Sequence, residues 1–197
     1  MKTMMALPAA AVSVFLFLGG ANAACPIPIT SKPTDASGHL AITKLSQLLV
    51  CSENDPMNDQ SPCNTFAGRG LESIYSVSDF KTATGFLSAN AIWDYVNASA
   101  KWASLGGVYN EDNNLCAQVM ANQALPVIAV MKAPGHGHIA LVIPGEPGKS
   151  GTWNMLAAYS ASFLYNHPDK AYVGGLLSKA YQPEDAKKAV FFYRKAF

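Results

Sequence analysis

The sequence predicts an α+β fold in which N-terminal helices pack on an antiparallel β-sheet. Segments with the spacing of an amphipathic helix lie in the first two thirds of the chain, at 41–51, 64–75, 89–96 and 114–123. Continuous apolar runs, which are typical of buried strands, come later, at 127–131, 139–143 and 189–194. Helices that precede strands along the chain favour the α+β class.

The composition excludes several classes of protein. The chain has 197 residues, of which 50% are hydrophobic and 14% are charged, so it can form a core and is not a disordered tail. The formal net charge of +1 argues against a dedicated nucleic-acid-binding protein, because such proteins usually carry a basic excess on one face. A chain of this length is expected to form one domain.

Residues 1–23 have the features of a secretory signal peptide. Lys2 provides a positive start, residues 9–18 form a short apolar run, and residues 21–23 (Ala-Asn-Ala) fit the rule for signal peptidase. The apolar run is too short to span a bilayer, which takes about 20 residues. We therefore expect cleavage after this triplet and a secreted protein, extracellular or periplasmic, of residues 24–197 without a membrane span.

The helices are expected in the following order. Residues 24–37 contain three prolines and are expected to be extended, before a helix at 41–51. The apolar spacing within 64–75 predicts the second helix. Ser88 can cap the third helix, since a serine oxygen at this position accepts a hydrogen bond from the first turn. Residues 114–123 form the fourth.

The strands follow the helices. Residues 127–131 and 139–143 are apolar runs that are too short for helices. Residues 144–151 (PGEPGKSG) are rich in glycine and proline and predict a turn. We expect the chain to fold back there, so that 152–159 pairs with the preceding strand. Residues 189–194 form the last strand.

The four cysteines are expected to include a disulfide, because an exported protein meets oxidising conditions. Cys51 and Cys116 both lie in apolar helical segments that can pack together, so we expect one bridge among Cys25, Cys51 and Cys116 and prefer Cys51–Cys116. Cys63 differs from these three, because it follows a polar loop and precedes a predicted helix.

Cys63 and His138 are the candidate nucleophile and base. A helix start favours the thiolate form of a cysteine, because unpaired N–H groups and the helix dipole stabilise negative charge. His138 stands at the start of a predicted strand, where a rigid element can hold an imidazole near the thiol. His136 is the alternative base. Neither histidine is accompanied by a cluster of metal ligands, and the chemistry needs no cofactor.

A third polar side chain should orient the imidazole. The predicted turn places Asn154 alongside the start of the His138 strand, so Asn154 is the candidate, with Ser160 as the alternative. The N–H group of Cys63 and the side chain of Gln60 are candidate donors to the oxyanion.

Two motifs resemble those of the papain-like NlpC/P60 and CHAP peptidoglycan hydrolases. Residues 61–75 (SPCNTFAGRGLESIY) resemble the cysteine-helix motif, and residues 137–142 (GHIALV) resemble the histidine-strand motif. The resemblance covers roughly residues 63–192 and is closest to the amidase effectors of type VI secretion and their secreted relatives. Asn64 departs from the family, which usually has a small residue after the nucleophile.

The resemblance implies a single papain-like hydrolase domain over residues 24–197. It implies hydrolysis of amide bonds in the peptide stems of bacterial peptidoglycan, with Cys63 and His138 as catalytic residues. The family motifs do not identify the third catalytic residue, for which the predicted turn gives Asn154. Peptidoglycan would be the main partner, and a protein inhibitor would be a further one.

Two other functions stay open from the sequence. One is a non-catalytic secreted binding protein held by two disulfides, and the other is an acyltransferase that uses the same cysteine and histidine. A free Cys63 thiol would favour an enzyme, whereas a protein with no free thiol would favour the binding protein.

Overall fold

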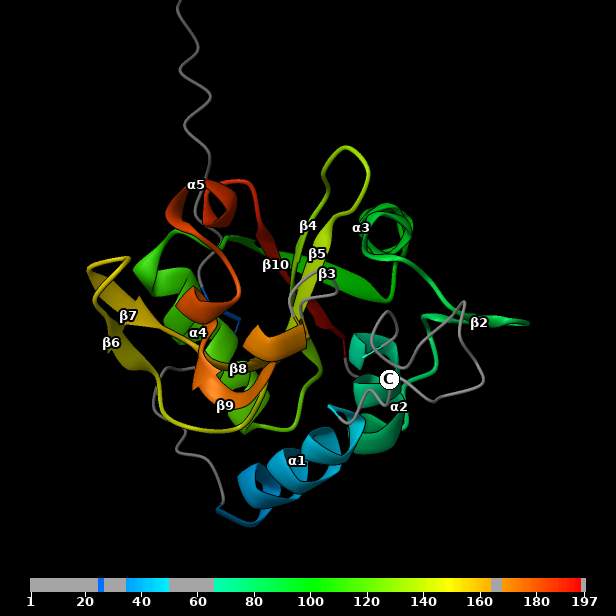
Figure 1. The fold of residues 1–197 in the computed structure, drawn as a ribbon, viewed down its shortest axis with the longest axis horizontal. Helices are drawn as coiled ribbons and strands as arrows, with labels where there is room; N and C mark the ends of the chain where they lie inside the picture. The colour runs from blue at the N-terminus through cyan, green and yellow to red at the C-terminus, as the bar shows by residue number, and fades with distance from the viewer. Residues whose placement is uncertain (1–24, 27–34, 50–65, 164–167, 196–197) are drawn as a thin grey trace, which may run out of the picture.

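A six-stranded antiparallel β-sheet forms the centre of the fold (Figure 1). The computed structural model describes residues 25–26, 35–49, 66–163 and 168–195, and the statements below concern these ranges. The strands lie in the order β3-β10-β4-β5-β8-β9. Their bounds are β3 Trp102–Gly107, β4 Val127–Met131, β5 His138–Val142, β8 Tyr159–Ser162, β9 Tyr172–Leu176 and β10 Val190–Arg194.

Helices cover both faces of this sheet, as Figure 1 shows with α4 on the left and α2 and α3 on the right. One face carries α1 Asp35–Leu48, α2 Phe66–Tyr75 and α3 Ala89–Ala98. The other face carries α4 Glu111–Asn122 and the short α5 Pro183–Ala186. We call these the α2 face and the α4 face.

Shorter elements complete the fold. Two small hairpins lie outside the central sheet and consist of β1 Lys81–Thr82 with β2 Gly85–Phe86, and β6 Gly148–Ser150 with β7 Met155–Ala157. Two 3₁₀ turns, η2 Pro168–Lys170 and η3 Leu177–Lys179, flank β9. The mixed α and β content and the antiparallel pairing confirm the predicted fold class.

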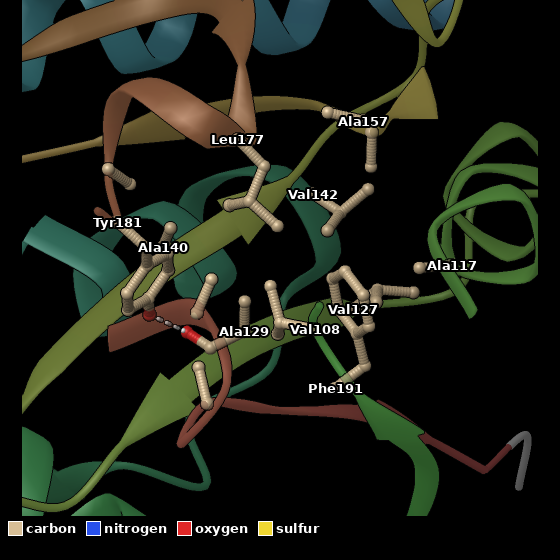
Figure 2. Packing of buried hydrophobic residues seen from close by; sticks show 14 of the residues in the cluster. Val108, Ala117, Val127, Ala129, Ala140, Val142, Ala157, Leu177, Tyr181 and Phe191 are labelled. Carbon is tan, nitrogen blue, oxygen red and sulfur yellow. Dashed lines mark hydrogen bonds between the residues drawn. The ribbon is translucent and has the colours of Figure 1, made fainter. Parts of the chain in front are cut away.

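The apolar run of β4 is continuous because both of its faces are covered. Val127 and Ala129 pack on the α4 face, whereas Ile128 and Val130 pack on the α2 face, and all four are fully buried. Figure 2 shows the α4 face of this packing, where strand residues such as Val127 meet Ala117 of α4. Because successive side chains of a strand point to opposite faces, the residues of this uniformly apolar run pack alternately into two separate cores.

Several predicted elements are confirmed. The Ser88 side chain caps α3 by accepting a hydrogen bond from the N–H group of Ala91, and Ile92 and Val96 are buried as predicted. The strand at 127–131 matches β4 in its bounds, and the strand at 189–194 matches β10 within one residue.

Other boundaries were wrong. The stretch expected to be extended up to residue 37 is already helical from Asp35. The fourth helix begins at Glu111 rather than Asn114, because Asn110 caps it by accepting a hydrogen bond from the N–H group of Asn113. The sequence reasoning also missed β3, which forms the sheet edge beside β10.

The predicted return strand at 152–159 was wrong as well. The chain makes an additional hairpin, in which β6 pairs with β7, before it reaches the central sheet. The strand that pairs with β5 is β8, with Ala140 opposite Ser162 and Val142 opposite Ser160. The glycine- and proline-rich stretch therefore leads into a hairpin of its own rather than directly back along β5.

The disulfide joins Cys25 to Cys116, with their Cα atoms 5.4 Å apart. One bridge among the three cysteines is thus confirmed, but the preferred Cys51–Cys116 pairing was wrong. The physical reason is that α1 packs on the α2 face, whereas Cys116 is buried on the α4 face, where Cys25 packs beside it. Cys51 lies outside the described residues.

A row of carboxamides on α4, two of them buried and one half-buried, links this helix to the chain between β5 and β8. Asn114, Gln118 and Asn122 are spaced by four residues, so they lie on one side of the helix. The Gln118 Oε1 atom accepts from the N–H group of Tyr159 at 2.7 Å, and its Nε2 atom donates to the Ile143 carbonyl at 3.0 Å. Gln118 thus holds the end of β5 and the start of β8 together.

The two neighbouring asparagines extend the same row. The Asn114 Oδ1 atom accepts from the N–H group of Ala158 at 3.0 Å, and the Asn122 Oδ1 atom accepts from that of Gly145 at 2.9 Å. Buried main-chain groups outside a ladder need such partners. The row therefore determines where the chain enters β8.

Replacing Gln118 by leucine should destabilise the protein by about 3 kcal/mol, because the Tyr159 N–H group and the Ile143 carbonyl would lose their partner in a buried place. Urea unfolding at neutral pH measures this change. Gln123→Leu is the matched control, since Gln123 ends the same helix and is exposed, and its cost should stay within about 0.5 kcal/mol. Equal losses in both variants would contradict a role for the carboxamide row.

Candidate functional site

His138 is the first residue of β5, and its imidazole is held by a serine. The Nε2 atom lies 2.9 Å from the Oγ atom of Ser162 on β8. Ala140 pairs with Ser162 across the two strands, and residues two apart on a strand share a face. His138 and Ser162 therefore both point toward the α4 face, and Ser162 is completely buried.

Tyr181 packs against the other side of this imidazole. The two ring centroids are 4.9 Å apart, and the rings meet edge to face at 71°. The Tyr181 hydroxyl donates to the Ala129 carbonyl at 2.7 Å, as the dashed line in Figure 2 shows. Because this bond to β4 anchors the tyrosine, the Tyr181 ring is held in a fixed position beside the imidazole.

The surroundings keep His138 neutral. Burial lowers the pKa of His138 from its ordinary value of 6.5 to about 4, and the negative charge of Asp185 opposes this shift only in part. At neutral pH the imidazole therefore carries no charge. A neutral imidazole is the form that can accept a proton from a reacting group.

The hydrogen bond to Ser162 distinguishes the two ring nitrogens. Among the described residues, Ser162 is the one hydrogen-bond partner of the His138 ring. When Nε2–H donates to the serine oxygen, the lone pair of Nδ1 is available to a second group. Ser162 can therefore select the tautomer of His138 that acts as a base through Nδ1.

The structure does not bring Asn154 to His138. The predicted strand pairing that placed it there was wrong, and Asn154 is an exposed residue in the turn between β6 and β7, with a left-handed φ of 53°. The alternative, Ser160, is buried on β8 but bonds to the Tyr172 hydroxyl at 2.8 Å. Ser162 occupies the position expected for the orienting group.

Sequence reasoning missed Ser162 and Tyr181 for different reasons. Residues 158–163 (AYSASF) alternate, so Ser160 and Ser162 share one face of a strand, and this pattern could have identified β8. Tyr181 belongs to an irregular segment after η3, and no local pattern connects it with the imidazole 43 residues away.

His136, the alternative base, lies in the loop between β4 and β5 and is exposed. Because β5 begins only at His138, strand alternation does not place His136 on the same face as His138. His138 has both an orienting partner and a packed ring.

Cys63 and Gln60 lie outside the described residues, but the helix that follows them is described. Its first residue, Phe66, packs against Phe163 with ring centroids 6.3 Å apart. Phe163 directly follows Ser162, the partner of His138. The start of α2 and the imidazole therefore lie at the same part of the sheet, although α2 packs on the face opposite to the His138 ring.

Other kinds of site find no support in the described ranges. There, no group of three or more histidine, cysteine or acidic side chains could hold a metal ion. No helix of the described residues is long and apolar enough to cross a membrane. Searches against protein-family models and against curated protein sequences find no match to this chain.

The lowered pKa of His138 predicts a loss of stability in mild acid. The unfolded chain takes up a proton as the pH falls below about 6.5, whereas the folded protein does so only near a pKa of about 4. The contribution of the neutral His138 to the free energy of unfolding is therefore complete above pH 6.5 and is lost between pH 6.5 and 4. The total loss is on the order of 3 kcal/mol.

Urea unfolding at pH 7 and at pH 4.5 measures this effect. The wild-type protein should lose more stability between the two pH values than His138→Gln, because glutamine does not titrate. The same loss in both proteins would show that the buried imidazole is not the source.

Proposed function

We propose that this protein is a secreted cysteine hydrolase of papain-like architecture that cleaves amide bonds in the peptide stems of bacterial peptidoglycan. Cys63 is the nucleophile, His138 is the general base, and Ser162 orients the imidazole. The observation that most supports this proposal is the placement of the His138 ring, which is bonded to Ser162 through Nε2 and packed against Tyr181.

The position of Cys63 in the chain supports its role as the nucleophile. Phe66, the first described residue of α2, follows it by three residues, which span at most about 11 Å even when fully extended. Phe66 contacts Phe163, the neighbour of Ser162. The start of α2 therefore lies near the end of β8, the strand that carries Ser162.

The reaction follows from these roles. The Cys63 thiol passes its proton to Nδ1 of His138, and the sulfur attacks the amide carbon to form a C–S bond and an oxyanion. The C–N bond then breaks, and the imidazolium returns the proton to the leaving amine. Water attacks the thioester, His138 takes a proton from it, and the acid product and the free thiol are released.

The choice of substrate rests on the sequence motifs and the export signal. Residues 61–75 and 137–142 resemble the motifs of peptidoglycan hydrolases, and residues 1–23 predict delivery outside the cytoplasm, where peptidoglycan lies. The Cys25–Cys116 disulfide is weakly consistent with such an oxidising compartment.

Thiol counting separates this proposal from a binding protein held by two disulfides. Because Cys25 and Cys116 are paired, only Cys51 and Cys63 can react with an alkylating agent. We expect mass spectrometry of the alkylated, unreduced protein to find both of them modified. A Cys51–Cys63 disulfide in the purified native protein would favour the binding protein.

Digestion of purified sacculi tests the catalytic roles. Cys63→Ala should abolish hydrolysis, and His138→Ala should reduce it by about 10³-fold, because general base catalysis contributes on this scale. Ser162→Ala should cost less, about 10- to 100-fold, since the thiol and imidazole remain. His136→Ala is the matched control for His138, and its rate should stay within about twofold of wild type. Wild-type turnover in Cys63→Ala would refute the mechanism.

A further inference from the structure

The loop between β4 and β5, residues 132–137, is held by one side chain of α3. The Oδ1 atom of Asn90 accepts from the N–H group of Ala133 at 3.1 Å. Its Nδ2 atom donates to the Ala133 carbonyl at 2.9 Å and lies 3.4 Å from that of Gly135. A single carboxamide therefore satisfies both main-chain groups of Ala133 in a loop that leads directly into His138.

Gly137 packs against the same carboxamide. A Cβ atom added to Gly137 would collide with the Oδ1 atom of Asn90 and with the Met131 carbonyl. Only glycine therefore allows the loop to approach Asn90 this closely. Because Gly137 immediately precedes His138, this contact reaches the backbone of the candidate base.

A second contact from α3 holds the other end of the loop. The Lys132 Nζ atom lies 2.6 Å and 2.8 Å from the two carboxylate oxygens of Asp94. Asp94 stands one helical turn after Asn90, so both side chains project from the same side of α3. The side chains of this ion pair are 48% and 62% exposed, so the pair contributes little energy compared with the Asn90 hydrogen bonds.

Asn90 is not needed for the helix that carries it. Ser88 caps α3, and Ile92 and Val96 anchor the helix to the sheet. Trp93 adds an edge-to-face contact with Phe192 of β10, at a centroid distance of 6.0 Å. The hydrogen bonds of the Asn90 side chain go to the loop instead, from a helix whose position on the sheet is already determined.

We propose that Asn90 is a positioning residue for His138, which holds the β4–β5 loop against α3 and thereby keeps the imidazole between Ser162 and Tyr181. This inference rests on the proposed function for its catalytic consequence. His138 is the first residue of its strand, and a strand end without such support frays.

Two titratable groups, Asp185 and Tyr181, lie near the His138 ring. Three more charged or titratable groups, Lys132, Asp94 and His136, lie on the loop or pair with it.

The test compares Asn90→Ala with Asn97→Ala. Asn97 lies on the same helix and is exposed, and among the described residues its side chain bonds only to the Trp93 carbonyl, at 2.8 Å. It is therefore a matched control. The first readout is the titration of the His138 ring in the full mature protein, followed by NMR with labelled histidine. The second readout is turnover of purified sacculi, with kcat and KM determined separately.

We expect Asn90→Ala to raise the NMR titration midpoint of His138 toward 6.5, because a loosened loop admits water to the ring. It should lower kcat by about 10- to 100-fold with little change in KM, as expected for a small misplacement of a catalytic group. Asn97→Ala should change neither quantity. Asn90→Asp keeps the acceptor for Ala133 N–H but loses the donor, so its kcat should lie between those of wild type and Asn90→Ala.

Gly137→Ala provides a second variant if Asn90→Ala does not fold, and it should shift the titration and kcat in the same direction. A wild-type titration and a wild-type kcat in both variants would overturn the role of Asn90. An inactive wild-type protein in which Asn90→Ala still shifts the His138 titration would refute the proposed hydrolase and leave the positioning role intact.

Discussion

The hydrogen bonds from the carboxamides of α4 to the main chain are the constraint on which the rest of the structure depends. Asn114, Gln118 and Asn122 bond to main-chain groups around both ends of the β6–β7 hairpin. Of these groups, the Ala158 N–H and the Ile143 carbonyl are buried, and leaving them without their carboxamide partners would cost a few kcal/mol. The row thus fixes where β8 begins, and the strand register then brings Ser162 to His138.

The candidate site consists of a polar pair, His138 and Ser162, that lies within an apolar core. His138 and Ser162 project into the same face as Leu177 and Tyr181, where the surroundings favour uncharged groups. Burial therefore lowers the pKa of His138, and the serine hydroxyl satisfies Nε2 without adding charge. The same environment that makes the imidazole neutral also fixes its direction, because Tyr181 is tied to β4.

The two faces of the sheet contribute differently to the site. The α4 face surrounds the histidine ring, whereas α2 and α3 pack on the other face. Phe66 of α2 reaches Phe163 beside Ser162, and Asn90 of α3 holds the loop that precedes His138. His138, at the start of β5, is therefore supported from both faces.

The sequence by itself determined the local elements of this protein. Apolar periodicity identified α2 and α3, and continuous apolar runs identified β4 and β10. The Ser88 cap was readable because a cap depends on residues within one helical turn. It also singled out His138. Only the tertiary structure decided which distant groups meet: the Cys25–Cys116 bridge, the β6–β7 hairpin that displaces Asn154, and Ser162 and Tyr181 around the imidazole. The physical reason is that strand register and helix packing are set by long-range hydrogen bonds and by which face each element covers, and neither leaves a signal within a short stretch of chain.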